Sequence, residues 1–443
     1  MKRILLLAAL LLFLLTAYAQ ADTQTLVLAT DMHYLSPGLT DYSERFMETV
    51  YASDGKMIHY SAEICRAFAE DMLEMHPDTV ILSGDLTLNG APVSLQEFAE
   101  LMRPLKEAGI QVLAMPGNHD IGGKAYTFAA DGVWSIPAAR AEEYASIYVE
   151  FGLSEAVSRD ASSLSYIAKA GEKTWIVMLD VNANGTEGSV KEKTLAWLEE
   201  QLQEARARGI CVIGVSHQNL LAHNRYFTSG VTINRPQKLQ ELYERYGVSL
   251  NLSGHTHMQH IASVGSITEI VTSSLILTPC QYGVIALEDG KPVSYDARPV
   301  QVEAWAQRAQ DPREDLLHFS AYAPAFFQDV VGRKVRAILD GGEVPEDDRE
   351  RMQEFAVLTS LRDFTGTRSP EDDETALALW ETYFPNNGFT YYLRGAVEKE
   401  GRQMIHEDFG RYAGYRRAEK KRARKKGLKR QSLLRAFSIL SQH

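Results

Sequence analysis

The N-terminal part of the chain alternates short apolar runs with longer segments in which apolar residues recur at helical spacing. The apolar runs at residues 25–30, 79–84 and 110–117 predict buried strands, because each is short and ends at small or polar residues. The segments 61–75 and 94–109 predict helices between these strands. Strands that alternate with helices in this way pair in parallel through right-handed crossovers, so the pattern predicts an α/β fold.

The alternation returns in looser form further along the chain. It predicts three more strands, at residues 174–180, 210–217 and 248–254, and two helices, at residues 193–209 and 236–247. Three short alternating runs follow, and their pattern favours antiparallel strands. These runs cover residues 260–265, 267–274 and 282–289.

The character of the sequence changes near residue 300. From about Val302 the segments have a helical pattern and are rich in charged and aromatic residues. We therefore predict a first domain over residues 22–300 and a C-terminal helical domain over residues 301–410. The aromatic residues of this second domain either form the core of a helix bundle or line one side of a substrate cleft.

The N-terminus has the pattern of an export signal. Lys2 and Arg3 precede an apolar run, and residues 17–19 (AYA) supply the small residues of a cleavage site. Residues 1–21 therefore predict a signal peptide and a secreted or extracytoplasmic protein. An uncleaved N-terminal membrane anchor is the alternative.

Charge is distributed unevenly. The whole chain has a formal net charge of −12, yet the segment Arg411–Arg435 holds 12 Lys or Arg residues and a single acid, Glu419. An acidic body argues against specific nucleic-acid binding. The basic tail, residues 411–443, predicts an anionic partner such as an envelope or membrane surface, or else is a solvated end that offsets the acidic body.

The three cysteines, Cys65, Cys211 and Cys280, are too few and too scattered for a disulfide framework. Cys211 lies in an apolar run and is interpreted as a buried filler. Whether Cys65 and Cys280 pair stays open.

Polar clusters recur where predicted strands end. Ligands of open α/β sheets bind outside the carboxyl ends of the strands, so distant clusters of this kind are expected to meet. The clusters contain Asp31 and His33, then Asp85, then Asn118, His119 and Asp120, then His217, and finally His255 and His257.

Imidazole nitrogens and hard oxygens without thiolates suit a pair of metal ions such as Mn, Fe or Zn. Asp31 and His33 are two residues apart and share a face if the strand continues. A single carboxylate such as Asp85 has two oxygens and can bridge two cations roughly 3.5–4 Å apart.

The ordered motifs D-x-H, G-D, G-N-H-D, H and G-H-x-H resemble those of the calcineurin-like metallophosphoesterases, over about residues 25–290. The resemblance implies a four-layer αββα sandwich of two mixed sheets and a dinuclear metal site. It implies that one metal is held by Asp31, His33 and His257, and the other by Asn118, His217 and His255, with Asp85 bridging them. It also implies that His119 is the catalytic imidazole and Asp120 the acid that orients it.

The narrower pattern is similar to the class III cyclic-nucleotide phosphodiesterases. Leu88 occupies the position where purple acid phosphatases carry a tyrosine ligand, and Asp120 stands where serine/threonine phosphatases have glutamate. The residues and the resemblance together favour an exported enzyme that hydrolyses phosphodiester bonds of a small substrate by attack of a metal-bridged hydroxide, with cyclic nucleotides as candidates. A phosphomonoesterase or pyrophosphatase, or a non-catalytic surface-binding module, are the alternatives.

Several polar residues have no assigned role at this point. His223 either contacts substrate or faces solvent, and Asn89 and Asn184 could reach the site from loops. His59 and His260 stay unassigned.

Overall fold

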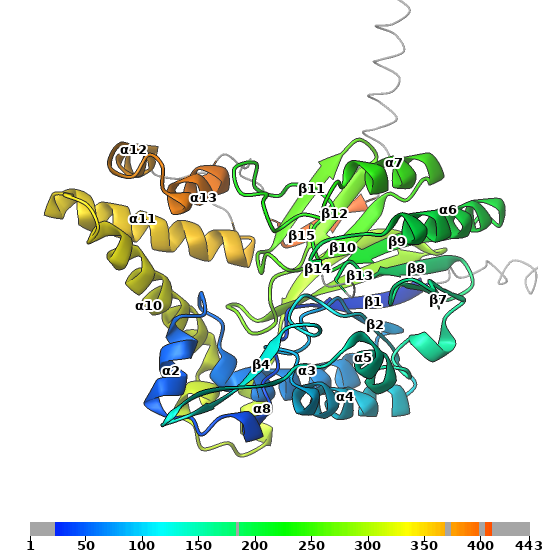
Figure 1. Cartoon of the computed structure of the whole chain (residues 1–443), viewed down its shortest axis with the longest axis horizontal. Coiled ribbons are helices and arrows are strands. Elements are labelled where there is room, and N and C mark those ends of the chain that lie inside the picture. Colours follow the sequence, from blue (N-terminus) through cyan, green and yellow to red (C-terminus); the bar gives the residue numbers. More distant parts are fainter. Residues whose placement is uncertain (1–22, 183–185, 368–373, 398–403, 410–443) are drawn as a thin grey trace, which may run out of the picture.

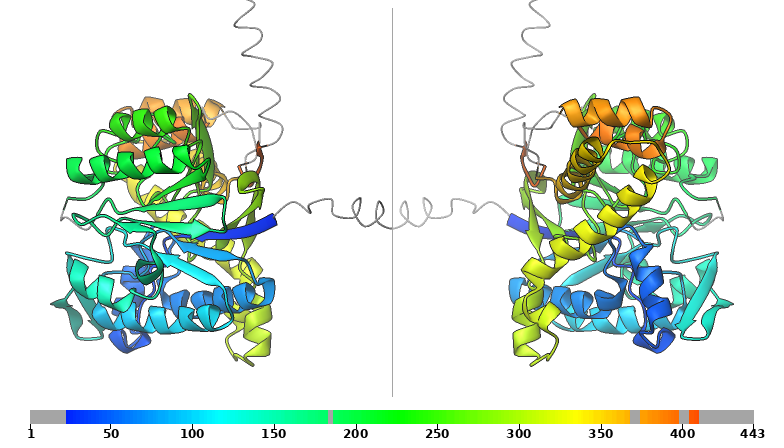
Figure 2. Two further views of the ribbon diagram at one scale, coloured as in Figure 1. Left: turned by 90° about the vertical axis from the view of Figure 1, so that its right-hand side faces the viewer. Right: turned by 90° about the vertical axis from the view of Figure 1, so that its left-hand side faces the viewer.

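The computed structural model describes residues 23–182, 186–367, 374–397 and 404–409. Its larger part is a sandwich in which two β-sheets face each other and helices cover both outer faces (Figures 1 and 2). A group of C-terminal helices lies beside this sandwich. The predicted four-layer architecture and the predicted C-terminal helical region are therefore confirmed.

The first sheet has the strand order β15-β14-β13-β1-β2-β3. Its strands are β1 (Thr23–Ala29), β2 (Thr79–Leu82), β3 (Gln111–Ala114), β13 (Gln281–Glu288), β14 (Lys291–Pro299) and β15 (His406–Asp408). β1, β2 and β3 pair in parallel, as the strand–helix alternation predicts. β13 pairs antiparallel with both β1 and β14.

The second sheet has the order β11-β12-β10-β9-β8-β7-β6. Its strands are β6 (Ser158–Arg159), β7 (Tyr166–Ala170), β8 (Thr174–Leu179), β9 (Cys211–Ser216), β10 (Leu250–Ser253), β11 (His260–Val264) and β12 (Ile267–Val271). β11 and β12 are antiparallel as expected, but β12 also pairs in parallel with β10. After β10 the chain forms β11 at the edge of the sheet and then turns back as β12, which lies between β10 and β11. β12 therefore runs opposite to β11 and in the same direction as β10.

Alternation along the strands builds the layers. In β1, Leu26 and Leu28 face the second sheet and pack with its residues Ile213 and Leu252. The side chain of Val27, which lies between Leu26 and Leu28, points to the opposite face of the sheet and packs toward the helices that cover the first sheet. Because successive side chains of a strand point to opposite faces, one strand contributes to two apolar layers.

Helices cover the outer faces of both sheets. α3 (Ser61–Met75), α4 (Pro92–Glu107) and α5 (Ala141–Ile147) lie on the first sheet, and α6 (Glu192–Ala207) and α7 (Gln237–Tyr246) lie on the second (Figures 1 and 2). Near this core, α2 (Glu44–Tyr51) contacts the hairpin of β4 (Lys124–Ala129) and β5 (Gly132–Pro137).

The C-terminal region begins with α8 (Val302–Arg308) and α9 (Glu314–Leu317) and continues with α10 (Phe319–Leu339), α11 (Glu346–Thr365), α12 (Glu374–Tyr383) and α13 (Gly388–Val397). The last four helices share an apolar core that includes Phe327, Met352, Trp380 and Leu393. The Trp380 indole donates a hydrogen bond of 3.0 Å to the Met352 carbonyl. Aromatic residues of this region therefore contribute to a helix-bundle core, one of the two roles predicted for them, while some of them, such as Phe389, also line a cavity that is described below.

The predicted signal peptide and basic tail lie outside the described residues. Among the helices that the structure describes, none is both long and apolar enough to cross a membrane. Cys65, Cys211 and Cys280 are free thiols, and Cys65 and Cys280 are buried.

Candidate metal centre

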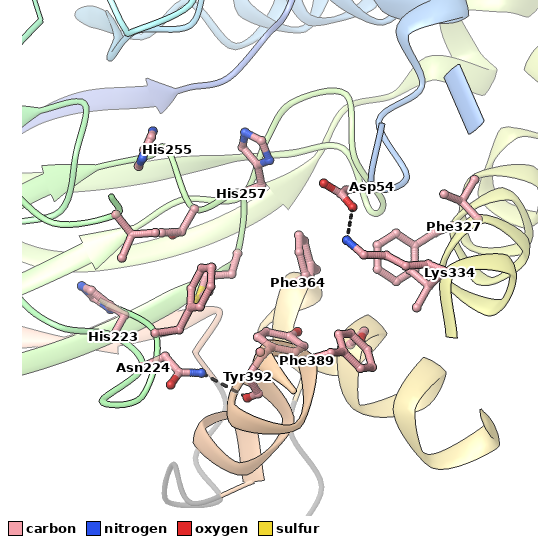
Figure 3. Close-up of a pocket in the computed structure, with 18 of the residues that line it drawn as sticks. Asp54, His223, Asn224, His255, His257, Phe327, Lys334, Phe364, Phe389 and Tyr392 are labelled. Atoms are coloured by element: carbon pink, nitrogen blue, oxygen red, sulfur yellow. Dashed lines mark hydrogen bonds and ion pairs between the residues drawn. The ribbon is translucent and has the colours of Figure 1, made fainter. Parts of the chain in front are cut away.

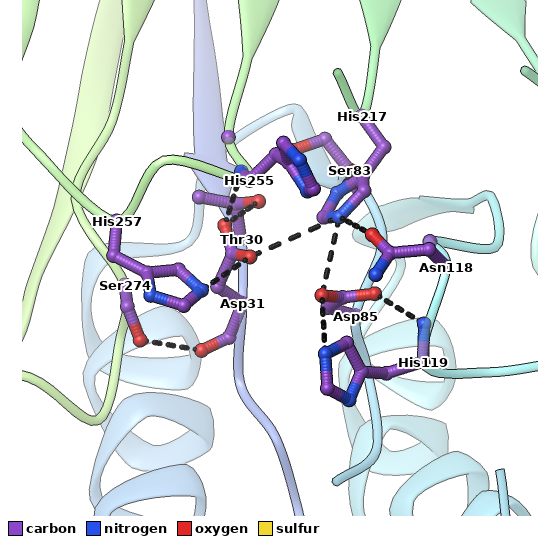
Figure 4. Close-up of polar contacts among 12 residues, drawn as sticks. Thr30, Asp31, Ser83, Asp85, Asn118, His119, His217, His255, His257 and Ser274 are labelled. Carbon is purple, nitrogen blue, oxygen red and sulfur yellow. Dashed lines mark hydrogen bonds and ion pairs between the residues drawn. The ribbon is translucent and has the colours of Figure 1, made fainter. Parts of the chain in front are cut away.

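The polar loops that follow β1, β2, β3, β9 and β10 converge at one edge of the sandwich (Figure 4). β1, β2 and β3 are parallel to one another, and so are β9 and β10, so the carboxyl ends within each group point the same way. The structure thereby brings together all the predicted metal ligands, namely Asp31, His33, Asp85, Asn118, His217, His255 and His257.

The donor atoms form two groups that share one carboxylate. The first group is Asp31, His33, Asp85 and His257, and the second is Asp85, His217 and His255. Within each group, one donor atom from every residue lies within 4.8 Å of the others. Asn118 adjoins the second group, because its Oδ1 lies 3.1 Å from Nε2 of His217.

In Asp31 and in Asp85, one carboxylate oxygen accepts hydrogen bonds from the protein and the other faces the histidines of the donor groups. Oδ2 of Asp31 accepts hydrogen bonds from the Thr30 hydroxyl at 2.7 Å and from the His255 backbone N–H at 2.8 Å. Its Oδ1 is buried 3.2 Å from Nε2 of His257, yet it makes no hydrogen bond within the described chain. A buried acceptor among imidazole nitrogens fits a cation at this position.

Asp85 is arranged in the same way. Its Oδ1 accepts the backbone N–H of His119 at 2.8 Å, while Oδ2 lies 3.2 Å from Nε2 of His217 and 4.0 Å from Nε2 of His33. Oδ2 is therefore the oxygen that faces the imidazoles of both groups. This position fits the bridging role that the family resemblance implies for Asp85.

Backbone carbonyls fix the orientation of two imidazoles. Nδ1 of His217 donates to the Ser83 carbonyl at 3.0 Å, which leaves Nε2 for a cation. Nε2 of His255 donates to the Gly230 carbonyl at 2.9 Å, which leaves Nδ1. Nε2 of His217 and Nδ1 of His255 are therefore the nitrogens available to a cation of the second group, which at His217 would take the place of a proton.

The backbone at the site is strained. Five of the predicted ligands have positive φ angles, namely Asp31 (53°), His33 (39°), Asp85 (49°), His255 (68°) and His257 (59°). Residues other than glycine rarely adopt this conformation, and such strain concentrates at functional sites. Close packing adds to the constraint, because a Cβ at Gly117 would collide with the Asp85 carboxylate.

Burial and neighbouring charges set the protonation states. Burial raises the pKa of Asp85, but the nearby histidines outweigh it, and the pKa lies well below its usual range. Burial lowers the pKa of His217, but Asp85 and Asp31 outweigh it and raise the pKa to about 9. Burial, with Lys56 adding, lowers the pKa of His33 well below 6.5. The structure thus places ionised carboxylates beside both neutral and charged imidazoles.

Asp120 does not orient His119, which corrects the role that the resemblance implied. Nδ1 of His119 donates instead to the Leu88 carbonyl at 2.7 Å. The buried Asp120 carboxylate accepts backbone N–H groups of Leu86, Thr87 and Gly117, at 3.1, 2.8 and 2.8 Å. The two side chains are adjacent in sequence but leave the backbone in different directions, so Asp120 ties two ligand-bearing loops together.

Other residues near the site were not predicted from the sequence. Gln218 donates to Asn118 Oδ1 at 3.3 Å and so orients that amide. Lys56 and Lys124 line a cavity of about 530 Å³ that also contains Asn118 and His119. Gln218 follows His217 directly, so the V-S-H-Q-N motif carried a signal for it, whereas the lysines reach the site only through the tertiary fold.

The unassigned residues have diverse environments. Asn89 lines the same cavity as His119, and His223 lines a second cavity beside His255 and His257. His260 bonds to His223, their Nδ1 atoms being 2.7 Å apart. His59 contacts Tyr322 of α10, and Asn184 lies outside the described residues.

The family model for calcineurin-like phosphoesterases matches residues 25–259, which is more than half of the chain. The chain therefore belongs to the calcineurin-like phosphoesterase family. A second model, described as the C-terminal domain of cyclic nucleotide phosphodiesterase, matches residues 301–410. The resemblances predicted from the sequence, to this family and to its cyclic-nucleotide phosphodiesterase branch, are confirmed.

Solved structures resemble part of this chain at low sequence identity. A dimetal phosphatase from Danio rerio is 12% identical, with a TM-score of 0.46, over 62% of this chain and 95% of that chain. A Thermus thermophilus protein is 12% identical, with a TM-score of 0.38, over 63% and 100%. A putative 5′-nucleotidase from Staphylococcus aureus is 13% identical, with a TM-score of 0.38, over 63% and 54%. Among curated proteins, none matches this chain.

Proposed function

We propose that this protein hydrolyses phosphodiester bonds of a small substrate at the two donor groups that share Asp85. The shared carboxylate is the observation that carries the proposal, because Oδ2 of Asp85 faces imidazoles of both groups. Asp31, His33 and His257 would hold one Mn, Fe or Zn ion, and Asn118, His217 and His255 the other. When bound, such a pair neutralises phosphate oxygens and lowers the pKa of a coordinated water.

Two neighbouring residues, His119 and Asn118, have further roles in the proposed reaction. His119 is more open than the ligands, since its side chain is 38% exposed. With Nδ1 committed to the Leu88 carbonyl, Nε2 is the atom that donates a proton to the leaving-group oxygen or stabilises its charge. Asn118 supplies a neutral oxygen, which limits the negative charge that an incoming phosphate meets.

A substrate panel tests the proposal. The metal-free protein is reconstituted separately with Mn, Fe and Zn and assayed with bis(p-nitrophenyl) phosphate, p-nitrophenyl phosphate and cyclic AMP. We expect the diester to be turned over faster than the monoester with at least one ion. A preference for the monoester would support the phosphomonoesterase, and two bound ions without turnover of any substrate would support the non-catalytic module.

Cyclic nucleotides are the substrates that we place first. The family description of the C-terminal domain names cyclic nucleotide phosphodiesterase, and the motifs of the first domain resemble that branch. Hydrolysis of cyclic AMP at a rate similar to that of bis(p-nitrophenyl) phosphate would support this assignment. Turnover of the synthetic diester alone would oppose it.

Export and surface binding are further parts of the proposal and rest on the sequence. Residues 1–21 would be removed on export, so the mature protein is expected outside the cytoplasm with a new N-terminus near Asp22. Residues 411–443 would bind an anionic surface. Mass analysis of the exported chain tests whether residues 1–21 are removed. Cosedimentation of the protein with anionic vesicles, with and without residues 411–443, tests the binding of the tail to an anionic surface.

A further inference from the structure

A second cavity adjoins the candidate metal centre and has a volume of about 350 Å³ (Figure 3). His255 and His257 form part of its wall, so it borders one residue of each donor group. The opposite wall comes from the C-terminal helices, with Phe327 on α10, Phe364 on α11 and Phe389 on α13. The cavity therefore exists only because the helical domain docks beside the metal-binding loops.

Aromatic rings dominate the wall on the helical side. Phe327 and Phe364 have ring centroids 5.4 Å apart, and Phe389 and Tyr392 have centroids 5.7 Å apart. Phe227, in the segment between β9 and α7, also lines the cavity. Flat aromatic surfaces favour flat aromatic ligands, because a base stacks on such rings whatever its sequence of ring atoms.

A few polar groups interrupt this apolar wall. Asn219, His223 and Asn224 line the cavity beside the aromatic rings. Ligand pockets typically combine an apolar wall with a few polar groups of this kind, which fix the orientation of the ligand. Such a wall suits a flat heterocycle with hydrogen-bonding atoms better than it suits an unbranched hydrocarbon chain.

Two contacts hold the cavity in shape. Lys334 of α10 pairs with Asp54 at 2.5 Å, and Asn224 donates to the Tyr392 carbonyl at 3.1 Å (Figure 3). Both contacts join a loop of the first domain to a helix of the second. They fix the aromatic wall relative to His255 and His257.

We propose that this cavity binds the heterocyclic base of a nucleoside phosphodiester while the phosphate lies at the metal centre. The inference rests on the proposed function and specifies its substrate class. The size suits the base, since ligand pockets typically occupy about 300–1,000 Å³ and are mostly apolar with a few polar groups. The C-terminal helical domain is thus a specificity element, and Phe389 is a specificity-determining residue.

A pair of substrates isolates the base. Thymidine 5′-(p-nitrophenyl) phosphate and methyl p-nitrophenyl phosphate share the leaving group and differ in the nucleoside. In the wild-type protein we expect kcat/KM to favour the thymidine ester by on the order of 10-fold, and Phe389→Ala to remove most of that preference. Phe389→Leu retains apolar volume without a ring and should also weaken the preference for the thymidine ester. This second variant shows whether the effect of Phe389→Ala comes from loss of the ring and not from a folding defect.

Phe384→Ala is the matched control. Phe384 belongs to the same domain and packs on Trp380, with centroids 5.6 Å apart, but does not line the cavity. The control should retain the wild-type ratio of the two kcat/KM values. Equal use of both esters by the wild type, or equal loss of preference in Phe384→Ala and Phe389→Ala, would overturn the proposal.

A binding measurement separates this inference from the proposed activity. Metal-free protein is titrated with 2-aminopurine riboside, whose fluorescence is quenched by stacking. Saturable quenching that Phe389→Ala weakens supports the cavity as a base site even if no ester is hydrolysed. Absence of quenching overturns it even if both esters are hydrolysed. A hexadecyl p-nitrophenyl phosphate that is preferred over the thymidine ester in a Phe389-dependent way would assign the cavity to an alkyl chain instead.

Discussion

Nε2 of His33 lies 3.1 Å from Nε2 of His257, a residue 224 positions further along the chain. Both nitrogens also lie near Oδ1 of Asp31, at 3.9 and 3.2 Å. Only one of two facing imidazole nitrogens can donate to the other, and Asp31 Oδ1 makes no hydrogen bond in the described chain. This arrangement fits nitrogen and oxygen ligands that share a cation better than it fits a hydrogen-bonded network.

Metal removal is expected to destabilise the protein as well as inactivate it. A cation that binds the folded state alone adds stability in proportion to the logarithm of its concentration over its Kd. Dialysis against a chelator should therefore lower Tm, and re-addition of Mn, Fe or Zn should restore it. Calorimetry with and without the ion measures this effect. An unchanged Tm with full activity would contradict a metal site at His33 and His257.

Asp85→Asn tests the shared carboxylate. The amide keeps the size of the side chain and can still accept the His119 backbone N–H, but it removes the charge that faces both groups. We expect the bound metal to fall from two ions to one or fewer, and kcat for diester hydrolysis to fall by roughly 10³-fold or more. Elemental analysis of the purified variant gives the first quantity. Two retained ions with normal turnover would rule out the bridging role.

His119→Ala separates the leaving-group role from metal binding. His119 is not in either donor group, so metal content should stay at the wild-type value. Removal of a general acid typically costs about 10²–10⁴-fold in rate, and less when the leaving group needs no proton. The loss should therefore be larger for cyclic AMP than for bis(p-nitrophenyl) phosphate. Equal losses for both substrates would argue against proton donation by Nε2.

Much of the fold and most of the site could be predicted from local sequence. The strands predicted at residues 25–30, 79–84 and 110–117 are recognised in the sequence as short apolar runs. Motifs at the ends of these strands, such as Asp31-x-His33, come together because the carboxyl ends of parallel strands lie at one edge of a sheet. The β4–β5 hairpin was missed because exposed apolar residues, including Trp134 at 55% exposure, obscure its alternation.

The rest depends on contacts that no local pattern encodes. Two of the backbone groups that bond to Asp120, those of Leu86 and Thr87, belong to another loop, so they follow from how β2 and β3 pair and not from the neighbour His119. The aromatic cavity depends on the docking of α10, α11 and α13 against loops far away in sequence. The positive φ of Asp85 likewise appears only when the surrounding packing enforces it.

Asp120→Ala should act on stability. It leaves the N–H groups of Leu86, Thr87 and Gly117 without their acceptor, and unpaired buried groups of this kind cost about 1–3 kcal/mol each. We expect the free energy of unfolding to fall by about 3 kcal/mol, measured by denaturant titration. Asp131→Ala, at an exposed position, is the control and should change it little. A stable Asp120→Ala protein with a shifted pH–rate profile would instead restore the role of Asp120 as the acid that orients His119.

His59 links stability to pH at the contact between the two domains. Burial lowers its pKa from 6.5 to about 4, with Asp315 opposing, and its Nε2 lies 2.8 Å from the Tyr322 hydroxyl of α10. A histidine with a lowered pKa stabilises the folded state fully above 6.5, and this contribution is lost as the pH falls toward about 4. Tm should therefore drop over that window more steeply in the wild type than in His59→Gln, which cannot be protonated but can still bond to Tyr322. His318→Gln, whose histidine is 75% exposed, serves as the control and should follow the wild-type curve. Parallel acid curves for the wild type and His59→Gln would mean that another group governs the loss.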